Sequence, residues 1–419
     1  MPASAPRTVW GRGRRRCALI LGEVRVLVAS TGGAGHFTPL VPFADAFVQQ
    51  GDEVLLVVPP SLGAAVLGSG RHLFKVGAEP PEKDVAAIRD RLPMVSASEG
   101  AVLADRELFG RLCTEAMLPE MEASFESWRP DLVVREPCEY ASAIVASRWD
   151  VPLATVAISL AEVEMGALAL AAPVLTPRSA AVVNQIRAAP YLTRFPAAAD
   201  PSRFPDTRRF RALDAEPTDP LPDWWGTSAD PLVYVTFGSV TGSLSIGPEL
   251  YRAVLDVMAG VEARVLLTVG HGADVSALGP IPENVHVEHW VPQGSVLAAA
   301  DVVVCHGGSG TTYGALAAGV PLVIVPLFAD QFSNSRCVAD AGAGLAVSPD
   351  SGVPEDRGRL SPGRKSRLAA AVEKVLGDDS FGEGARRVAA EMRDFPSIEE
   401  VVCSLASGGP GAGPAAALS

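Results

Sequence analysis

Short runs of β-branched and other apolar residues alternate with helical patterns through most of the chain. The first run covers residues 24–30 (VRVLVAS), and the glycine turn TGGAGH and a predicted helix from about Pro39 to Gln50 follow it. Proline suits the first turn of a helix, and glycine suits the position after its end, where Gly51 stands. A second predicted strand covers residues 53–58. Alternating strands and helices are typical of parallel sheets with helical crossovers.

The second half of the chain repeats this plan. An apolar run at 232–237 (LVYVTF) precedes a glycine turn and a predicted helix near 248–260. Two such openings predict an α/β fold with two doubly wound, Rossmann-like domains, at 23–210 and 232–395, facing each other across a cleft. The proline-rich stretch at 211–231 is interpreted as the linker between them.

Both ends of the chain differ in composition from the middle. The arginine-rich residues 1–22 and the Gly/Ala/Pro-rich residues 407–419 are expected to be disordered. The apolar stretch within the first of these is shorter than the ~7–15-residue core of a secretory signal. Residues 396–406 are expected to form a C-terminal helix that packs back on the N-terminal domain.

The length of the chain bears on its domain number, and its charge excludes some classes of partner. The chain has 419 residues, more than the roughly 250–300 at which a single core stops growing. Its 35 basic and 48 acidic residues give a net charge of −13. Nucleic acids require a basic face and anionic membranes a polybasic patch, so neither is expected as a partner. The six cysteines lack metal-like spacing, which is typical of a reduced, cytoplasmic protein. The sequence is also compatible with a homodimer.

Several ligand classes are disfavoured because their motifs are missing. The first glycine turn carries Thr38 where a dinucleotide fingerprint has its third glycine, and the next strand ends in two prolines instead of an acidic residue. The sequence has no Walker loop, no G-x-S-x-G elbow and no D-x-D pair. His286 and His289 are three apart in a predicted strand, so they lie on opposite faces. We therefore expect no metal and no cofactor.

The most informative stretch lies between residues 284 and 344. A predicted strand at 302–305 runs into a glycine turn, and a helix begins at about Thr311. The glycines let backbone amides approach a ligand, the helix start adds a positive dipole end, and Ser309 and Thr311 add hydroxyls. This combination predicts an anion site that needs neither lysine nor metal. The turn consists of His306, Gly307, Gly308, Ser309 and Gly310.

The neighbouring strands carry further candidates. Trp290 ends the strand before the turn, where its indole can stack on a flat base. Asp330 and Gln331 follow the strand after it, and together they can accept and donate hydrogen bonds to sugar hydroxyls. Each feature alone also fits a purely structural role: the tryptophan could serve in packing, the glycines could form an ordinary turn, and the Asp-Gln pair could cap a helix. Together they follow the order of the parts of a nucleotide-sugar.

These motifs resemble those of the nucleotide-sugar glycosyltransferases of the GT-B fold. Within that group the chain is most similar to the bacterial branch that decorates polyketides, macrolides and enediynes. The similar stretches are GAGHFTPL near the start, VYVTFGS at the opening of the second half, and the block WVPQ…HGGSGTT…GVPL…P…ADQ. The resemblance covers nearly all of the chain from Val24 to about Val402.

The resemblance implies a role for each residue of the block. Trp290 and Val291 contact the base of the donor, and Gln293 lies near the ribose. Asp330 and Gln331 hold the sugar. The residues implied around the diphosphate are Ser239, His306, Ser309, Gly310 and Thr311.

One position departs from the pattern of plant relatives. Where they carry a ribose-binding glutamate on the helix after the glycine turn, this sequence has Gly314. The departure puts the ribose contact in doubt and favours a dTDP-sugar, whose ribose lacks one hydroxyl, over a UDP-sugar.

His36 follows the first strand beside a helix start. The helix dipole there disfavours the imidazolium, so we expect a neutral ring that can accept a proton. The resemblance implies that this histidine deprotonates the acceptor. Such a base requires a carboxylate on its far nitrogen. Glu136, which follows the predicted strand 131–135, is the candidate, and Glu139 is its competitor.

Together these features predict a metal-independent, inverting transfer of a sugar to a hydroxyl, or an aromatic carbon, of a hydrophobic natural product such as a polyketide. Residues 62–121 and 157–191 are read as apolar, irregular segments, with Met165, Leu168 and Leu170 as candidates for the acceptor pocket. The alternatives are a sugar-nucleotide epimerase, a lipid-acceptor transferase, and a non-catalytic partner of another transferase.

Overall fold

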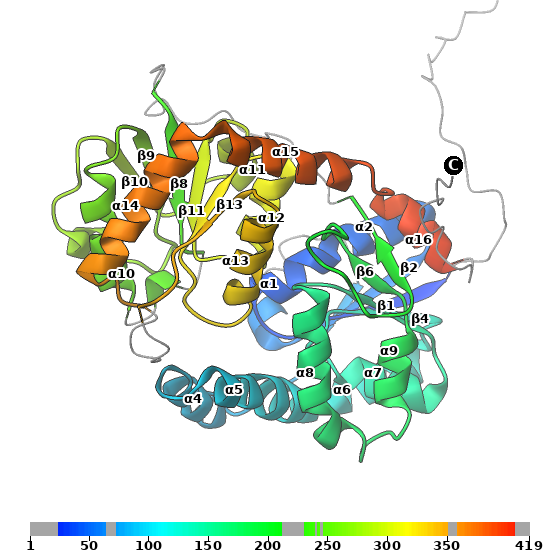
Figure 1. The fold of residues 1–419 in the computed structure, drawn as a ribbon. Coiled ribbons are helices and arrows are strands. Elements are labelled where there is room, and N and C mark those ends of the chain that lie inside the picture. Colours follow the sequence, from blue (N-terminus) through cyan, green and yellow to red (C-terminus); the bar gives the residue numbers. More distant parts are fainter. Residues whose placement is uncertain are drawn as a thin grey trace, which may run out of the picture.

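The structure, a computed structural model, forms two α/β domains and a C-terminal helix (Figure 1). The predicted extension at 1–22, the tail at 407–419 and most of the predicted linker lie outside the described residues. The described residues are 24–63, 73–211, 230–238, 241–243, 246–350 and 358–406.

The N-terminal domain is built on a parallel sheet that contains seven strands among the described residues. In sheet order they are β3 (Leu73–Val76), β2 (Glu53–Val58), β1 (Arg25–Ala29), β4 (Leu132–Arg135), β5 (Leu153–Val156), β6 (Tyr191–Thr193) and β7 (Thr207–Arg209). Its helices are α1 (Ala34–Phe37), η1 (Thr38–Leu40), α2 (Val41–Gln50), α4 (Glu82–Arg91), η2 (Leu92–Met94), α5 (Ala97–Ala101), η3 (Val102–Cys113), α6 (Thr114–Trp128), α7 (Ala141–Trp149), α8 (Ala161–Leu175) and α9 (Val182–Ala188).

The C-terminal domain has the same plan, with six parallel strands among the described residues. In sheet order they are β10 (Val285–Glu288), β9 (Arg264–Thr268), β8 (Leu232–Thr236), β11 (Val302–Cys305), β12 (Leu322–Ile324) and β13 (Gly344–Ala346). Its helices are η5 (Thr241–Ser243), α10 (Gly247–Met258), η6 (Val275–Leu278), α11 (Gln293–Leu297), α12 (Ser309–Ala318), α13 (Gln331–Asp340), α14 (Pro362–Gly377) and α15 (Asp379–Arg393). In both sheets the first strand lies in the middle, so both are doubly wound as predicted.

Two predictions differ from the structure. The helix predicted from Pro39 is preceded by helical turns, because α1 and η1 already lie between the glycine turn and α2. The expectation that residues 62–121 and 157–191 are irregular is wrong, since α4 to α6, η3, α8 and α9 fill much of both segments. The buried residues of α8 recur at helical spacing, but the apolar Leu170 lies outside that buried set. The helix therefore shows little contrast between an apolar and a polar face, which is the contrast that sequence patterns detect.

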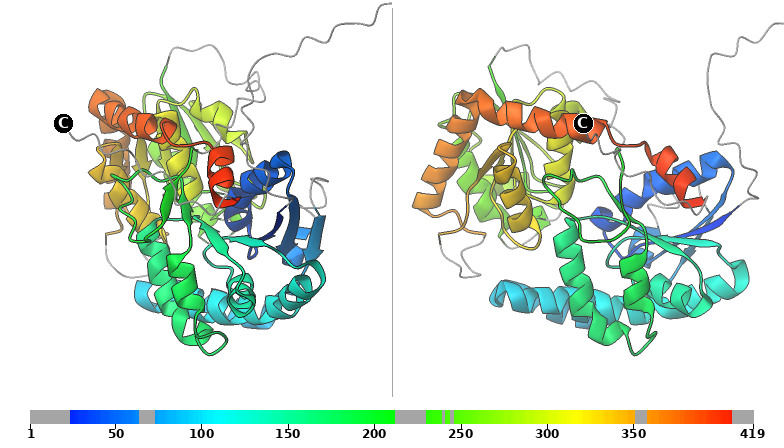
Figure 2. Two further views of the ribbon diagram at one scale, coloured as in Figure 1. Left: turned by 90° about the vertical axis from the view of Figure 1, so that its right-hand side faces the viewer. Right: turned by 45° about the vertical axis from the view of Figure 1, so that its right-hand side comes forward.

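The two domains pack directly against each other. Leu160 and Phe195 of the N-terminal domain are buried in the same apolar cluster as residues of β8, β11 and α12. Figure 1 shows α15 leading from the C-terminal domain toward α16 (Ile398–Ala406), which lies against α2. Figure 2 shows the same arrangement from two further sides. The described residues contain no helix long and apolar enough to cross a membrane.

The apolar face of α16 completes the core of the N-terminal domain. Ile398, Val401 and Val402 are almost fully buried in the cluster that also holds Phe43 and Phe47 of α2. The Gln50 side chain of α2 donates to the backbone carbonyl of Glu399, 3.0 Å away.

The substitution Ile398→Ala should therefore destabilise the N-terminal domain by about 2–4 kcal/mol, through lost apolar burial and the cavity left behind. The measurement is the urea-unfolding midpoint. Val48→Ala is the matched control, because Val48 of α2 is 42% exposed and its loss should change stability by about 0.5 kcal/mol or less. Equal effects of the two substitutions would contradict a structural role for α16.

Candidate active site

Strand order brings the residues that follow β1 and β4 together. Ala29 of β1 pairs with Arg135 of β4 in a parallel register, so both strands end at the same edge of the sheet. Thr31 and His36 follow one strand, and Glu136 follows the other. The strand order reverses at this point, which is where doubly wound sheets bind their ligands.

Glu136 is fully buried and accepts hydrogen bonds on both oxygens. Its Oε1 accepts from the backbone N–H of Thr31 at 3.0 Å and from the Thr31 hydroxyl at 2.7 Å. Its Oε2 accepts from the backbone N–H of Cys138 at 2.7 Å and lies 3.2 Å from Nδ1 of His36. Burial alone would raise the pKa of Glu136, but the His36 charge and these hydrogen bonds lower it to about 2. Glu136 is therefore an ionised carboxylate facing His36.

Thr31 fixes which ring nitrogen of His36 carries the proton. Its Oγ1 lies 3.1 Å from Nδ1 of His36 and donates its own hydrogen to Glu136. Both partners of Nδ1 therefore act as acceptors, which places the ring proton on Nδ1 and leaves Nε2 as the proton acceptor. The His36 side chain is 22% exposed, and its ring centroid lies 5.3 Å from that of Phe109 on η3.

The helix dipole was expected to lower the pKa of His36, but the net shift is in the opposite direction. Burial lowers the pKa of His36, but Glu136 and, from the other domain, Asp330 raise it more, so the net pKa lies above the ordinary histidine value. The helix concerned, α1, is a single turn of four residues. The partial charge of its N-terminus is weaker than the full negative charge of Glu136.

Glu139, the competing carboxylate, serves a different purpose. It is buried, and its side chain accepts from the backbone N–H and the hydroxyl of Ser142 in the first turn of α7. Its backbone carbonyl accepts from Nε of the buried Arg135 at 2.5 Å. Among the described residues, Glu136 is thus the carboxylate that contacts His36, whereas Glu139 accepts hydrogen bonds from the first turn of α7.

His36, Glu136 and Cys138 are the one group of possible metal ligands in the described parts of the chain, with ligand atoms within 4.8 Å of one another. Burial raises the pKa of the Cys138 thiol well above its ordinary value, which disfavours the thiolate that metals bind. Both oxygens of Glu136 already accept two hydrogen-bond donors each. These residues therefore suit a histidine–carboxylate pair better than a metal centre.

The C-terminal domain presents its glycine turn at the equivalent edge. Thr236 of β8 pairs with Cys305 of β11, and the chain then passes through His306 and the glycine turn into α12. This helix begins at Ser309, two residues before the predicted start. Its first turn therefore includes Gly310 and Thr311.

Gly307 and Gly308 are required by the packing of the protein itself. Gly307 has a φ of +90°, and a Cβ there would lie 2.7 Å from a methyl group of Ile324. A Cβ on Gly308 would lie 2.6 Å from Nε2 of His306. Gly310 differs, because a Cβ there would meet nothing within 4 Å. The side of the turn near Gly310 is thus open.

His306 lies between Gly238 and Gly308, and in the described parts of the chain it forms no ion pair with a carboxylate. A Cβ on Gly238, which follows β8, would lie 3.0 Å from its ring. Burial lowers the pKa of His306 to about 4, against a weaker opposing effect of Asp330. Its Nδ1 is buried without a hydrogen-bond partner among the described residues. His306 is therefore a neutral imidazole at pH 7.

The residues predicted around the base and ribose follow β10. Trp290 is 61% exposed, whereas Val291 is buried. Gln293 begins α11 and donates from Nε2 to Oγ1 of Thr311 at 3.1 Å, so it is tied to the glycine turn. A Cβ on Gly314 would lie 3.8 Å from Oε1 of Gln293, which places Gly314 beside it.

Asp330 and Gln331 are adjacent, but their side chains make different hydrogen bonds. Oδ2 of Asp330 accepts from the Ser309 hydroxyl at 2.8 Å and from Nδ2 of Asn334 at 3.1 Å. Gln331 is buried, and its Oε1 accepts from the backbone N–H groups of Leu327 and Phe328. The amide oxygen of Gln331 thus closes the turn before α13, while the half-buried carboxylate of Asp330 lies beside the glycine turn.

The structure adds site residues that the sequence reasoning missed. Thr31 joins His36 to Glu136, and its position at the end of β1, in the TGGAGH turn, is the signal that could have revealed it. Asn334 follows Asp330 by one helical turn and also donates to the backbone carbonyl of Gly307. Ser239, predicted at the diphosphate, lies outside the described residues.

The predicted acceptor residues fall on α8. Leu168 belongs to the core of the N-terminal domain, which favours packing over ligand binding. Met165 packs beside the stacked rings of Tyr191 and Phe204, and Leu170 is half-buried.

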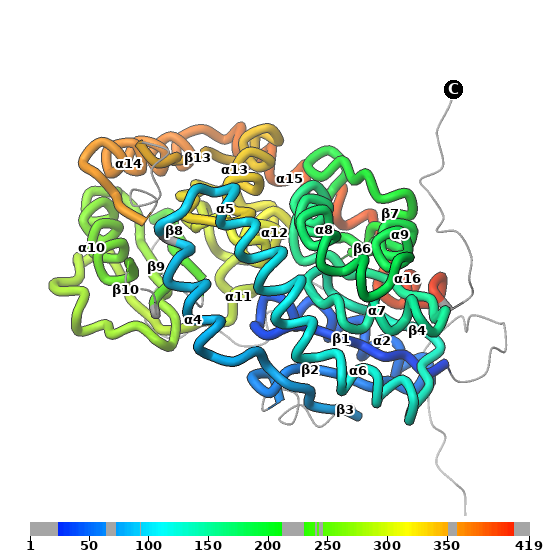
Figure 3. The backbone as a smooth tube through the Cα atoms, turned by 90° about the horizontal axis from the view of Figure 1, so that it is seen from below, coloured from blue at the N-terminus to red at the C-terminus, as the bar shows by residue number. Residues whose placement is uncertain are grey.

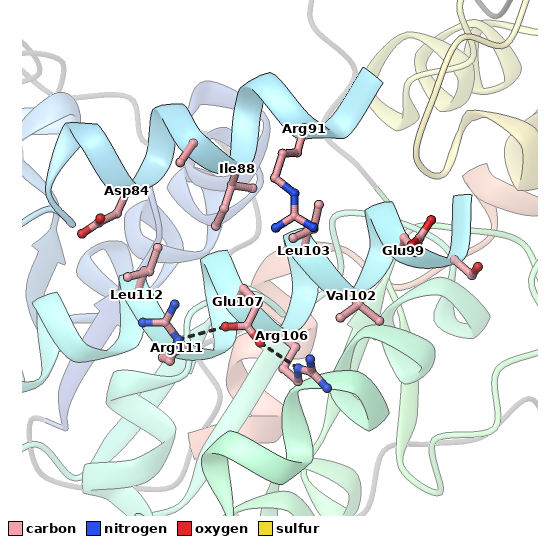
Figure 4. Close-up of a pocket in the computed structure, with 12 residues that line it drawn as sticks. Asp84, Ile88, Arg91, Glu99, Val102, Leu103, Arg106, Glu107, Arg111 and Leu112 are labelled. Atoms are coloured by element: carbon pink, nitrogen blue, oxygen red, sulfur yellow. Dashed lines mark hydrogen bonds and ion pairs between the residues drawn. The ribbon is translucent and has the colours of Figure 1, made fainter. Parts of the chain in front are cut away.

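A separate surface groove lies between α4 and η3. It encloses about 720 Å³ and is lined by Ile88, Leu103 and Leu112 together with charged side chains. Figure 4 shows Glu107 paired there with Arg106 and Arg111. Figure 3 shows that α4 and α5 reach from the N-terminal domain toward the C-terminal domain. The groove includes none of the residues at either sheet edge, so we do not assign the chemistry to it.

Comparison with known proteins agrees with this geometry. Residues 45–173 match the N-terminal domain of the erythromycin biosynthesis protein CIII-like family, and residues 252–407 match its C-terminal domain. Elloramycin glycosyltransferase ElmGT of Streptomyces olivaceus is 32% identical over 404 residues, which cover 91% of this chain and 97% of that protein.

Two solved structures are similar over most of their length. The glycosyltransferase SnogD from Streptomyces nogalater has a TM-score of 0.71 at 27% identity and covers 92% of this chain and 99% of its own. The glycosyltransferase SsfS6 of Streptomyces sp. SF2575, complexed with thymidine diphosphate, has a TM-score of 0.71 at 25% identity and covers 92% of this chain and 100% of its own. The chain therefore belongs to the natural-product glycosyltransferases of the GT-B fold.

Proposed function

We propose that this glycosyltransferase moves a sugar or deoxysugar from a thymidine-diphosphate donor to a hydroxyl, or an aromatic carbon, of a hydrophobic natural product. The transfer inverts the anomeric centre and uses neither metal nor cofactor. The observation that carries the proposal is the His36–Glu136 pair, which lies within electrostatic reach of Asp330 of the other domain. A base from one domain and a candidate sugar-binding carboxylate from the other thus lie near each other.

The reaction is a single in-line displacement. Nε2 of His36 takes the proton of the acceptor hydroxyl while the acceptor oxygen attacks the anomeric carbon. The bond from that carbon to the diphosphate oxygen breaks on the opposite face, and its electron pair leaves with the nucleoside diphosphate. Glu136 holds the tautomer and stabilises the imidazolium that forms.

The leaving diphosphate would be stabilised by backbone amides at the start of α12. The positive end of this ten-residue helix and the hydroxyls of Ser309 and Thr311 suit an anion. Support comes from Gly310, whose open side admits a ligand, and from the exposed indole of Trp290, which can stack on the base. The neutral His306 can contribute a hydrogen bond without adding charge.

The choice of thymidine over uridine rests on two observations. Gly314, beside Gln293, has no side chain to bind a ribose hydroxyl. The similar SsfS6 structure holds thymidine diphosphate. A hydrophobic acceptor is supported by Phe109 beside His36 and by ElmGT, whose name assigns it elloramycin.

His36→Ala should lower kcat/KM by about 10²–10⁴-fold, because the acceptor loses its general base. The assay uses TDP-glucose and an acceptor selected by screening aromatic polyketides. TDP affinity should stay unchanged, since His36 lies outside the glycine turn. The turnover of wild type should also survive EDTA. Near-wild-type turnover of the variant, or loss of wild-type turnover with EDTA, would contradict the mechanism.

The pH dependence tests the histidine–carboxylate pair. Because the base must be unprotonated, kcat/KM falls as the pH decreases through the pKa of His36, which is raised in the wild type. Glu136→Gln removes the charge that raises this pKa and leaves the burial that lowers it. The acidic limb of the pH–rate profile should therefore move to lower pH, while the plateau falls about 100-fold or more. An unshifted acidic limb would refute the pairing.

Donor class is tested by thermal shift. At concentrations well above Kd, TDP should raise Tm by about 2 °C or more through preferential binding to the folded state. UDP at the same concentration should raise it less. A larger shift with UDP would overturn the assignment of a thymidine donor.

A further inference from the structure

The Asp330 carboxylate accepts a hydrogen bond from the opposite domain. The Ser159 hydroxyl donates to Oδ2 of Asp330 across the domain interface, at 3.0 Å. Ser159 lies on the loop between β5 and α8, and its side chain is buried. A residue of the N-terminal domain thus contacts the group that our proposed function assigns to the donor sugar.

The position of Ser159 is fixed on its own domain. Its backbone N–H donates to Oε1 of Glu164 at 2.6 Å, and the N–H of Ile158 donates to the same oxygen at 2.8 Å. The buried Tyr191 hydroxyl donates to the Ser159 carbonyl at 3.5 Å. The backbone that carries the Ser159 hydroxyl is therefore held in place by the N-terminal domain.

The orientation of Asp330 depends on its side-chain contacts. Ala329 before it has a φ of +54°, in the left-handed region that favours glycine, so the turn is strained. The Ser159, Ser309 and Asn334 side chains all donate to Oδ2. No described residue donates to Oδ1, which leaves that oxygen as the acceptor for a ligand.

We propose that Ser159 is a positioning residue that holds Asp330 with Oδ1 turned toward a hydroxyl of the donor sugar. This inference rests on the proposed function. It implies that the nucleoside diphosphate is bound by the C-terminal domain alone, whereas sugar recognition requires both domains in contact. The N-terminal domain would then contribute to the choice of sugar as well as to the acceptor.

Other contacts hold the domains together without Ser159. Arg336 and Glu162 form an exposed ion pair between the domains. Nη2 of Arg194 donates to the Ser309 carbonyl at 3.4 Å. The shared apolar cluster is independent of both. Loss of one hydroxyl should therefore leave the interface in place.

The test measures binding of TDP and of TDP-glucose to the full-length enzyme by isothermal titration calorimetry. Ser159→Ala should weaken TDP-glucose about 10-fold, because a hydrogen bond to a charged group is lost. It should change TDP affinity less than about 2-fold, which also shows that the variant is folded. Ser159→Thr, which keeps the hydroxyl, should restore part of the loss.

Two comparisons make the result specific. Ser147→Ala is the matched control, because Ser147 is a half-buried serine of the same domain that bonds Ser179 instead. In an Asp330→Ala background, Ser159→Ala should cause little further loss, since the carboxylate that Ser159 positions is already absent. An unchanged TDP-glucose affinity, or an equal loss for TDP and TDP-glucose, would overturn the role of Ser159. Wild-type enzyme that bound neither ligand would instead contradict the proposed function.

Discussion

A buried negative charge on Glu136 constrains the centre of the N-terminal domain. An ionised carboxylate without partners is very costly in a protein interior, so the fold must bring donors to it. They come from three places: the turn after β1 supplies Thr31, α1 supplies His36, and the turn after β4 supplies Cys138. The requirement fixes how the two turns sit relative to each other. It also fixes the His36 ring.

The two histidines of the cleft show how a partner charge decides the state of an imidazole. Both are largely shielded from water, and burial alone lowers the pKa of each. His36 has Glu136 at 3.2 Å, and its pKa is raised. For His306 the opposing effects of Asp330 and of a hydrogen bond to the Thr236 backbone are weaker than that of burial, and its pKa falls to about 4. One ring is thus suited to accepting a proton, while the other remains a neutral hydrogen-bonding group.

Sequence patterns predicted the two sheets and named most residues of the candidate site, because glycine turns and buried strands are local signals. Strand order then explains why Glu136, 100 residues after His36, lies beside it. Thr31, Ser159 and Asn334 were missed because their roles arise from tertiary contacts that no local pattern records. The expected direction of the His36 pKa shift was wrong for the same reason, since the dipole of α1 is local and Glu136 is not.

The glycine turn before α12 serves the protein and the ligand at different positions. Gly307 and Gly308 are needed because Ile324 and the His306 ring occupy the space of a side chain. These two glycines would be required even if no phosphate ever bound, so they are evidence of close packing. Gly310 faces open space, and nothing in the protein excludes a side chain there. Under the proposed function, a diphosphate at the amides of the first helical turn would fill this space, so Gly310 is the glycine of this motif that the ligand would require.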